Sequence, residues 1–546
     1  MSRSATLRYW SSILTLALIG LSGILWATRY GLGLREDSFS YITAAESLAA
    51  GTGLGRWAAD GTFRPLTHFP PLFPILLGAV RAAGADILPA MRLLHAVLFG
   101  ATILLVGVMT RRLTGSPLFS CLAAGTALGS RVLIEQYAWA HSEPTYLFLS
   151  LLALFALASF LDRRDDERLL LGSAALQSLA TLARYAGAAL SAASLPAILL
   201  RREVRCGRRA ASTLSFIAIA LGPSLALFGY NRLAYGTLAD RPALSWHPPD
   251  GSAWVGAART IGGWLLPFQL IDRLSPAQVV LAAGLILIGL AGATVYFLRG
   301  NVADQGHFSP RAIGLGKALA GWVLAYAALL MATVFLFDRL TPLNDRILAP
   351  IYLAGLLLFA ALASFAWSRA RWRARTLLAF LALVAGGVHA YRGYQEFSTL
   401  HAEGLGLASR TWSLSPTIQL VRGLPPVPIY TNDLPALYFL AGRNASYIPS
   451  AINPALDAPR SDYREQLAAM RLALETRHGV LVLLGPNALG RLDLRYLDDL
   501  IQGLCVEADL ADGVVFRSIA PQERPLPVPQ GPPRCPPEQE SGLQTP

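Results

Sequence analysis

Long apolar runs separated by short polar loops fill the first 394 residues of the chain. Each run has about the 20 residues that an α-helix needs to cross a bilayer. We therefore predict an α-helical polytopic membrane protein with about eleven transmembrane helices. Their expected ranges are 10–30, 87–109, 117–135, 144–161, 169–185, 186–200, 211–230, 277–298, 315–337, 347–367 and 376–391.

Arginines gather in every second loop between these runs, for example at 111–112, 163–164, 201–209 and 369–375. Basic residues favour cytoplasmic loops, so this alternation predicts a cytoplasmic N-terminus in the plasma (inner) membrane. An odd number of helices then puts the C-terminus and the long polar loops on the extracytoplasmic side. The net charge of +12 could also suggest nucleic acid, but its confinement to short loops makes nucleic-acid binding the weaker interpretation.

The longest early polar segment is the loop 31–86 that follows the first run. Apolar positions between Asp37 and Leu48 recur at helical spacing, which predicts a short amphipathic helix on the membrane surface. Gly51 and the glycines after it end this helix, and prolines near residue 70 precede a further apolar helix. This transmembrane domain with its outer loop is expected to span 1–394.

The composition changes to that of a soluble domain after residue 394, and we expect an extracytoplasmic α/β domain over 395–520. Apolar segments predict strands at 427–431, 480–484, 504–508 and 514–519, with helices at 435–440 and 463–477. The remainder, 521–546, is rich in proline and is predicted to be a disordered tail. Cys505 and Cys535 either pair, if this region is extracytoplasmic, or remain free thiols.

Charged residues near a bilayer are costly unless they serve a site, a pathway or a partner. Four groups of them fall at helix ends that the predicted topology places on the outer side. They are Glu36 and Asp37 with Arg64 and His68; His141, Ser142 and Glu143; Arg184 and Tyr185; and Asn344, Asp345 and Arg346. We expect these groups to converge at one outer site.

Several of these segments resemble the GT-C glycosyltransferases, in particular the branch that holds protein O-mannosyltransferases, aminoarabinose transferases and their bacterial relatives. The similar segments are Asp37 to Tyr41, Ala44 to Gly51, Pro70 to Pro74, Ser142-Glu143-Pro144, Ala183 to Gly187, Asn344 to Pro350, Tyr430 to Asn432 and Tyr438 to Arg443. Two positions depart from that family's pattern: several relatives carry Asp in place of Glu143, and an aromatic residue in place of Ile347.

The resemblance implies an inverting transfer of a sugar from a polyprenyl-phosphate donor to a hydroxyl of a lipid, glycan or protein acceptor. Asp37 would be the general base, and Arg184 and Arg346 would bind the donor phosphate, because guanidinium groups bind phosphate oxygens in pairs. Further contacts to donor or acceptor are expected from Glu36, Tyr41, Arg64, His68, His141, Glu143, Tyr185 and Asp345.

Other interpretations of these residues remain open at this stage. Asp37 could cap the helix that follows it, and the two arginines could extend to lipid headgroups. His68 and His141 could form a metal site with Glu143, or simply be two surface histidines. The chain has no Asp-x-Asp pair, which favours a reaction independent of metal ions. We expect no cofactor.

Two other functions compete with the enzyme. A polytopic transporter of a lipid-linked or small polar solute would explain the short fifth and sixth helices, since transporters use interrupted helices. A third possibility is a catalytically inactive relative that acts in binding or assembly.

Overall fold

The computed structural model describes residues 3–58, 61–162, 166–200, 205–239, 244, 246–299, 309–337, 341–453, 458–485, 496–518 and 534–535. The chain forms two compact units. The first comprises Met1–Gly55 and Pro65–Leu405, and the second comprises Arg56–Arg64 and Gly406–Pro546. The tail predicted at 521–546 lies outside the described residues, apart from 534–535.

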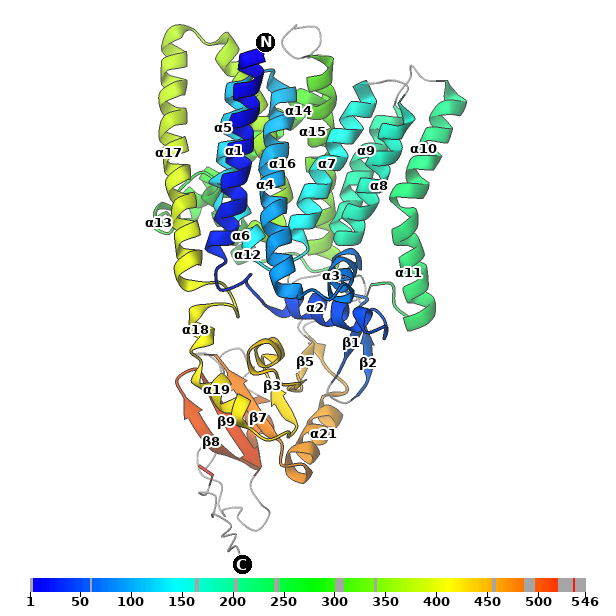
Figure 1. Cartoon of the computed structure of the whole chain (residues 1–546), viewed down its shortest axis with the longest axis vertical. Coiled ribbons are helices and arrows are strands. Elements are labelled where there is room, and N and C mark those ends of the chain that lie inside the picture. The colour runs from blue at the N-terminus through cyan, green and yellow to red at the C-terminus, as the bar shows by residue number, and fades with distance from the viewer. Residues whose placement is uncertain are drawn as a thin grey trace, which may run out of the picture. The chain divides into compact units, whose positions relative to one another are not determined.

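The first unit is a bundle of helices (Figure 1). Its helices are α1 (Arg3–Ala27), α2 (Glu36–Ala49), α3 (Leu72–Ala82), α4 (Ile87–Thr114), α5 (Pro117–Leu128), α6 (Arg131–Ala138), α7 (Glu143–Asp162), α8 (Glu167–Ala183), η1 (Tyr185–Gly187), α9 (Ala188–Leu199), α10 (Cys206–Ala220), α11 (Gly222–Tyr235), α12 (Gly251–Gly263), α13 (Phe268–Ile271), α14 (Pro276–Leu298), α15 (Pro310–Ala332), η3 (Thr333–Phe337), α16 (Asp345–Arg369) and α17 (Trp372–Glu403).

The long helices of this unit have the length and composition of membrane spans. Within the described part of the chain, seven are long and apolar enough to cross a bilayer, and up to nine if each bent helix pair counts as one span. The predicted count of eleven is therefore not confirmed. The core lies where α1, α4, α7, α15 and α16 meet, and it includes fully buried side chains such as Ile13, Phe99, Leu151, Trp322 and Leu357.

Two of the predicted spans are bent rather than continuous. The third divides into α5 and α6 at an angle of 52°. Ser130 caps α6 by accepting a hydrogen bond from the Leu133 backbone N–H, and Gly393 of α17 packs closely against Gly129. The seventh divides into α10 and α11 at 46° around Leu221. The fifth and sixth correspond to α8 and η1–α9, and they meet at Arg184, whose backbone is extended.

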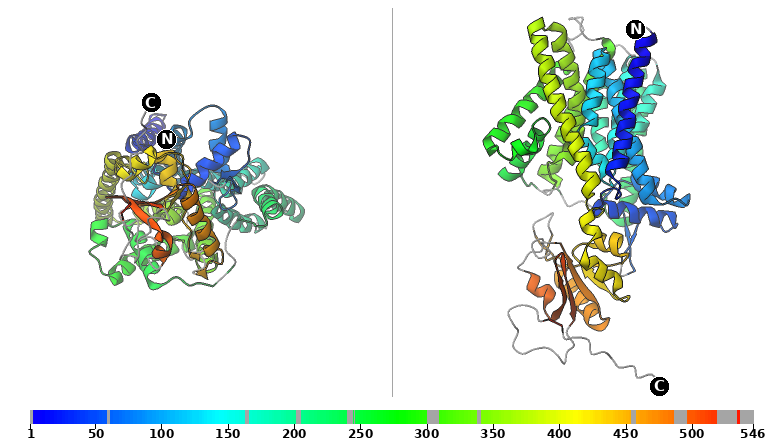
Figure 2. Two further views of the ribbon diagram at one scale, coloured as in Figure 1. Left: turned by 90° about the horizontal axis from the view of Figure 1, so that it is seen from below. Right: turned by 60° about the vertical axis from the view of Figure 1, so that its left-hand side comes forward.

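The short helix predicted between Asp37 and Leu48 is present as α2, and its place on the membrane surface stays a prediction. Helices α2 and α3 pack on each other and lie across one end of the bundle, near the end of α4 (Figure 1). The last helix of this unit, α17, runs beside the first, α1 (Figure 2). It continues to Glu403, beyond the domain boundary expected at residue 394.

The second unit is the small α/β unit that the sequence predicts. Its elements are β1 (Gly55–Trp57), β2 (Phe63–Pro65), α18 (Arg410–Ser413), α19 (Pro416–Gly423), β3 (Ile429–Thr431), α20 (Leu434–Ala436), η4 (Leu437–Ala441), β4 (Ser446–Tyr447), β5 (Ile452–Asn453), β6 (Ala458–Pro459), α21 (Tyr463–Thr476), β7 (Val480–Leu484), α22 (Leu497–Ile501), β8 (Leu504–Leu510) and β9 (Gly513–Ser518).

Five of these strands form one mixed sheet in the order β4-β3-β7-β9-β8. Strand β3 pairs in parallel with β4 and β7, whereas β9 pairs antiparallel with β7 and β8. The central strand β7 is buried along its whole length, which matches its unbroken apolar sequence. A disulfide joins Cys505 to Cys535, so of the two alternatives for these cysteines the structure has the bridge.

Candidate functional site

Gly33 fixes the position at which α2 begins. Its backbone N–H donates to the Ala138 carbonyl at 2.8 Å, and its own carbonyl accepts from the Ala140 N–H at 2.9 Å. A Cβ at Gly33 would lie 2.7 Å from the Trp139 ring, so a larger residue would displace one of the two segments. The Ser38 hydroxyl adds a bond to the Ala140 carbonyl at 2.9 Å. The first turn of α2 is thereby held beside the segment that leads into α7.

Glu143 lies between two arginines from distant parts of the chain. It is the first residue of α7, and its side chain is only 4% exposed. Arg184 Nη1 lies 2.7 Å from Glu143 Oε1, and Arg346 Nε binds the same oxygen. Both arginines lie at helix ends. Arg184 separates α8 from η1, and Arg346 lies in the first turn of α16. The buried carboxylate thus holds both guanidinium groups in one place.

Asp37 joins this cluster through Arg346, whose Nη2 binds Asp37 Oδ2. The Arg346 and Asp37 side chains are 19% and 20% exposed, so the ion pair is largely shielded from solvent but a ligand can still contact it. Asp37 is the second residue of α2 and Arg35 is the N-cap, so the structure does not support the interpretation of Asp37 as the cap. Two carboxylates and two guanidinium groups therefore form one charge-balanced cluster.

His141 is fully buried behind the cluster, so the interpretation of it as a surface histidine is wrong. Its Nε2 accepts a hydrogen bond from Arg35 Nε at 2.7 Å, and the Arg35 guanidinium also lies 4.3 Å from the centre of the Trp139 ring. Burial, reinforced by nearby arginines, holds the pKa of His141 well below 6.5 despite Glu143. The imidazole is therefore neutral and accepts from Arg35.

Two tyrosines complete the walls around Asp37 and Arg184. The buried Tyr41 hydroxyl lies 3.1 Å from Ser142 Oγ, and burial raises the pKa of this phenol, which stays protonated. Its ring packs against Phe69 and Phe73. Tyr185 donates a hydrogen bond to the Thr67 carbonyl at 3.2 Å. These contacts attach the loop after α2 to the bend between α8 and α9.

A cavity of about 900 Å³ opens in front of the cluster. The predicted catalytic residue, Asp37, and both predicted phosphate-binding residues, Arg184 and Arg346, line it. The other lining residues are Tyr41, His68, Phe69, Pro70, Tyr185, Ala186, Phe228, Arg232, Gly236, Thr237, Leu238, Ala239, Leu244, Tyr326, Leu329, Leu330, Thr333, Phe337, Thr341, Pro342 and Ile347. The cavity therefore joins a charged end to an extensive apolar wall.

The other predicted contact residues lie in different places. Glu36 is exposed on α2, and Arg64 is exposed on β2, within the second unit. Asp345 lines a separate cavity of about 250 Å³ and accepts a hydrogen bond from Trp264 Nε1 at 3.2 Å. Arg346 lines both cavities.

Sequence reasoning missed Arg35, Gln136 and Tyr326. Arg35 directly precedes the predicted acidic pair, so its position in the charged run 35–37 was an available signal. Tyr326 lies inside an apolar run, yet it lines the larger cavity and donates to the Ile347 carbonyl at 2.7 Å. Gln136 lies beyond the third predicted span, and its role depends on the bend at Gly129, for which the Gly129-Ser130 pair was an available signal.

The expected independence of metal ions stays a prediction. Among the residues that the structure describes, His, Cys, Asp and Glu side chains form no group of three or more that could hold a metal ion. His68 lines the larger cavity, whereas His141 is engaged by Arg35 and lies 3.9 Å from Glu143.

No protein-family model and no curated protein matches this sequence. Solved structures do. ArnT from Cupriavidus metallidurans in the apo state superposes with a TM-score of 0.52 at 15% identity, over 94% of this chain and 99% of that one. An oligosaccharyltransferase from Archaeoglobus fulgidus gives a TM-score of 0.54 at 12% identity, over 94% of this chain and 74% of that one. The chain has the GT-C fold.

The arabinofuranosyltransferase AftD from Mycobacteria also has this fold, with a TM-score of 0.50 at 15% identity. The match covers 92% of this chain but only 41% of AftD. These comparisons and the apolar helices identify the chain as a multi-pass membrane protein with a GT-C fold.

Proposed function

We propose that this protein is an integral membrane glycosyltransferase that moves a sugar from a polyprenyl-phosphate donor to an acceptor hydroxyl, with inversion. The observation that carries the proposal is the convergence of Asp37, Arg184 and Arg346 on one cavity with both a charged and an apolar wall. The proteins found to share the fold, ArnT, the oligosaccharyltransferase and AftD, are transferases and support the same reaction class.

The two arginines would bind the donor phosphate. Arg346 uses Nε and Nη2 for the carboxylates, and its Nη1 has no protein hydrogen-bond partner among the described residues. Arg184 reaches Glu143 through Nη1. The remaining N–H groups of both side chains are suited to phosphate oxygens, because a guanidinium donates in several directions at once. Glu143 keeps the two like charges together without occupying all of their donors.

Asp37 would act as the general base. The acceptor oxygen attacks the anomeric carbon as its proton passes to the Asp37 carboxylate. The bond from the anomeric carbon to the phosphate oxygen breaks, and the polyprenyl phosphate leaves with the bonding electrons. Arg184 and Arg346 stabilise the charge that develops on this phosphate. Attack opposite to the leaving group inverts the anomeric centre.

The apolar wall of the cavity is suited to the first isoprene units of a lipid-linked donor. Large apolar side chains form it, namely Phe228, Leu238, Leu244, Leu329, Leu330 and Phe337. A site at a bilayer surface lets the remainder of a polyprenyl chain stay in hydrocarbon, where its transfer from water is most favourable.

We place the reaction and the second unit on the extracytoplasmic face of the plasma membrane, with the N-terminus in the cytoplasm. The arginine-rich loops support this orientation. The bridge between Cys505 and Cys535 supports it as well, because disulfides persist mainly in oxidising compartments.

A transporter is the second candidate, and the bent pairs α5–α6 and α10–α11 are the observation that favours it. Transport and transfer predict different products. A transporter would move an intact solute, whereas a transferase would consume a lipid-linked sugar and lengthen an acceptor.

The deciding experiment is mass spectrometry of envelope glycans and polyprenyl-phosphate sugars from cells with and without the protein. We expect one lipid-linked sugar to accumulate in its absence, together with an acceptor that lacks the corresponding residue. An unchanged set of lipid-linked sugars and acceptors would contradict the transferase proposal.

The same measurement on Asp37→Asn and Glu36→Gln identifies the base. We expect Asp37→Asn to insert and fold normally and to lose about 10²- to 10⁴-fold in transfer, the usual contribution of a general base. Glu36→Gln should retain transfer, because Glu36 is not among the residues that line the cavity. Full transfer by Asp37→Asn would reject Asp37 as the base.

A further inference from the structure

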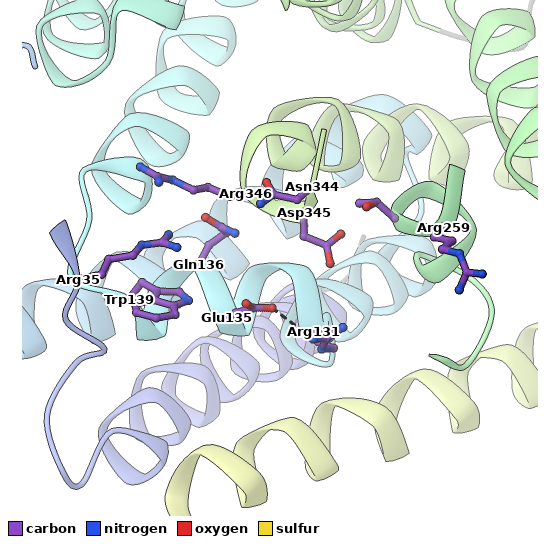
Figure 3. A pocket seen from close by; sticks show the side chains of 10 residues that line it. Arg35, Arg131, Glu135, Gln136, Trp139, Arg259, Asn344, Asp345 and Arg346 are labelled. Atoms are coloured by element: carbon purple, nitrogen blue, oxygen red, sulfur yellow. Dashed lines mark ion pairs between the residues drawn. The ribbon is translucent and has the colours of Figure 1, made fainter. Parts of the chain in front are cut away.

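The smaller cavity shares Arg346 with the larger cavity, and nine of its ten lining residues are polar or charged (Figure 3). Helix α6 and the residue after it supply one wall, and α12 with the first turn of α16 supplies another. Its lining residues are Arg35, Arg131, Glu135, Gln136, Trp139, Arg259, Thr260, Asn344, Asp345 and Arg346. Its volume of about 250 Å³ is near the lower end for small-molecule sites, about 300 Å³.

Acidic side chains balance most of the arginines in this cavity. Arg131 lies 3.0 Å from Glu396 and 3.6 Å from Glu135. Arg259 lies 3.5 Å from Asp272, and Arg346 binds Asp37 and Glu143. Little positive charge is left for an anionic ligand. The lining instead offers closely spaced donors and acceptors, which is the arrangement that neighbouring hydroxyl groups require.

Gln136 indicates that the cavity is made to hold a ligand. The residue is only 2% exposed, and its Oε1 is buried without a hydrogen-bond partner among the described residues. A buried acceptor without a donor is unfavourable, and a hydroxyl group that donates to this oxygen removes that cost. Figure 3 shows the side chain between Arg35 and Arg346, next to the indole of Trp139.

We propose that the smaller cavity binds a sugar ring of the acceptor, as a neutral polyhydroxylated group, with one of its hydroxyls donating to Gln136 Oε1. The proposal rests on the function proposed above and makes the acceptor a glycan. Donor and acceptor then occupy cavities that share Arg346 in their walls. Arg346 also binds Asp37, so the wall of this cavity includes a residue that contacts the proposed base.

Saturation-transfer NMR on the full-length protein in lipid nanodiscs tests this binding without any donor. The probes are methyl glycosides of common pentoses and hexoses. We expect at least one of them to bind saturably and Gln136→Met to weaken that binding about fivefold, the effect of losing one neutral hydrogen bond. Gln136→Glu retains an acceptor oxygen and should bind within about twofold of the wild type. The matched control Gln395→Leu, at an exposed position of α17, should bind like the wild type.

Two results would overturn the proposal. They are the absence of saturable binding by every methyl glycoside and equal affinity for wild type and Gln136→Met. Normal consumption of a lipid-linked sugar alongside either of these would reject the acceptor subsite alone. Glycoside binding that depends on Gln136, in a protein that consumes no lipid-linked sugar, would uphold the subsite and reject the transferase.

Discussion

Helix α7 has an acidic residue at each end, and the two are used differently. At its start, Glu143 holds Arg184 and Arg346, and Arg346 also holds Asp37 at the wall of a large cavity. At its end, Asp162 accepts from Arg112 of α4 at 2.7 Å, and Arg112 also donates to Ser159 at 2.7 Å. Neither Arg112 nor Asp162 is among the residues that line the two cavities described above.

The comparison separates a structural ion pair from a site. The pair between Arg112 and Asp162 joins two neighbouring helices, and its two side chains are 12% and 13% exposed. The Glu143 cluster joins α2, α7, α16 and the α8–η1 bend. Both of its arginines line the larger cavity. Glu143 also gains from the positive end of the α7 dipole, whereas Asp162 stands at the negative end and depends on Arg112. Four variants test this distinction.

Glu143→Gln should have the largest effect on stability. Removing this carboxylate leaves Arg184 and Arg346 close together without the charge that balances them. Loss of one partner of a buried ion pair typically costs about 3–5 kcal/mol, so we expect a strongly lowered melting temperature in detergent. A melting temperature equal to that of the wild type would show that Asp37 alone holds the cluster together.

Arg346→Lys should affect transfer rather than folding. Lysine keeps the charge but cannot bind Asp37, Glu143 and a phosphate in one plane. We expect about a 10²-fold loss of transfer, comparable to the loss of one donor to a developing anion. Arg112→Lys is the matched change at the other end of the bundle and should retain transfer. Equal losses of transfer in Arg346→Lys and Arg112→Lys would contradict the distinction between a functional cluster at Glu143 and a structural ion pair at Asp162.

Asp162→Asn should reduce stability by a smaller amount than Glu143→Gln. A hydrogen bond between charged groups contributes roughly 2 kcal/mol, and the unfavourable helix end offsets part of that. Thermal unfolding should therefore show a modest decrease, while transfer by the folded protein stays at the wild-type level. A transfer defect in folded Asp162→Asn would mean that this end of α7 also serves the reaction.

The convergence of Asp37, Arg184 and Arg346 was predictable because each is a charged residue beside the end of an apolar run. Topology alone then assigns all three to one side of the membrane. The same reasoning placed Arg64 and Glu36 with them, since position relative to a span does not say which way a side chain points. The strands β7, β8 and β9 were likewise predictable from their apolar sequences, whereas β4, β5 and β6, with two residues each, are too short for a pattern.

The smaller cavity was not predictable because it depends on a contact between distant glycines. A Cβ at Gly393 would lie 2.6 Å from Gly129 Cα, so α17 approaches the α5–α6 bend at backbone distance. That bend moves Arg131 and Glu135 out of the expected span and into the wall of the cavity, together with Gln136 just beyond the span. The Gly129-Ser130 pair is a local signal for a helix break, but nothing local to residues 117–135 indicates the contact with α17.

His141 gives the smallest expected effect, a dependence of stability on pH. Because burial holds its pKa well below 6.5, the folded protein keeps His141 neutral, whereas the unfolded chain binds a proton near pH 6.5. The stabilisation is therefore complete above that pH and is lost as the pH falls. Between pH 7.5 and 5.5 this loss amounts to roughly 1 kcal/mol. The charged groups that face the ring, Arg35, Arg184, Arg346 and Glu143, stay ionised over this range and do not alter the sign.

His141→Asn should flatten this part of the pH profile of the melting temperature, although the variant is less stable at every pH. The difference between variant and wild type isolates His141, because the other histidines contribute equally to both. His478→Asn is the matched control, since His478 is exposed with a positive φ of 49°, a conformation that asparagine also tolerates. An unchanged acid-side slope in His141→Asn would mean that the folded and unfolded chains bind a proton at His141 equally, and the burial argument for a lowered pKa would be wrong.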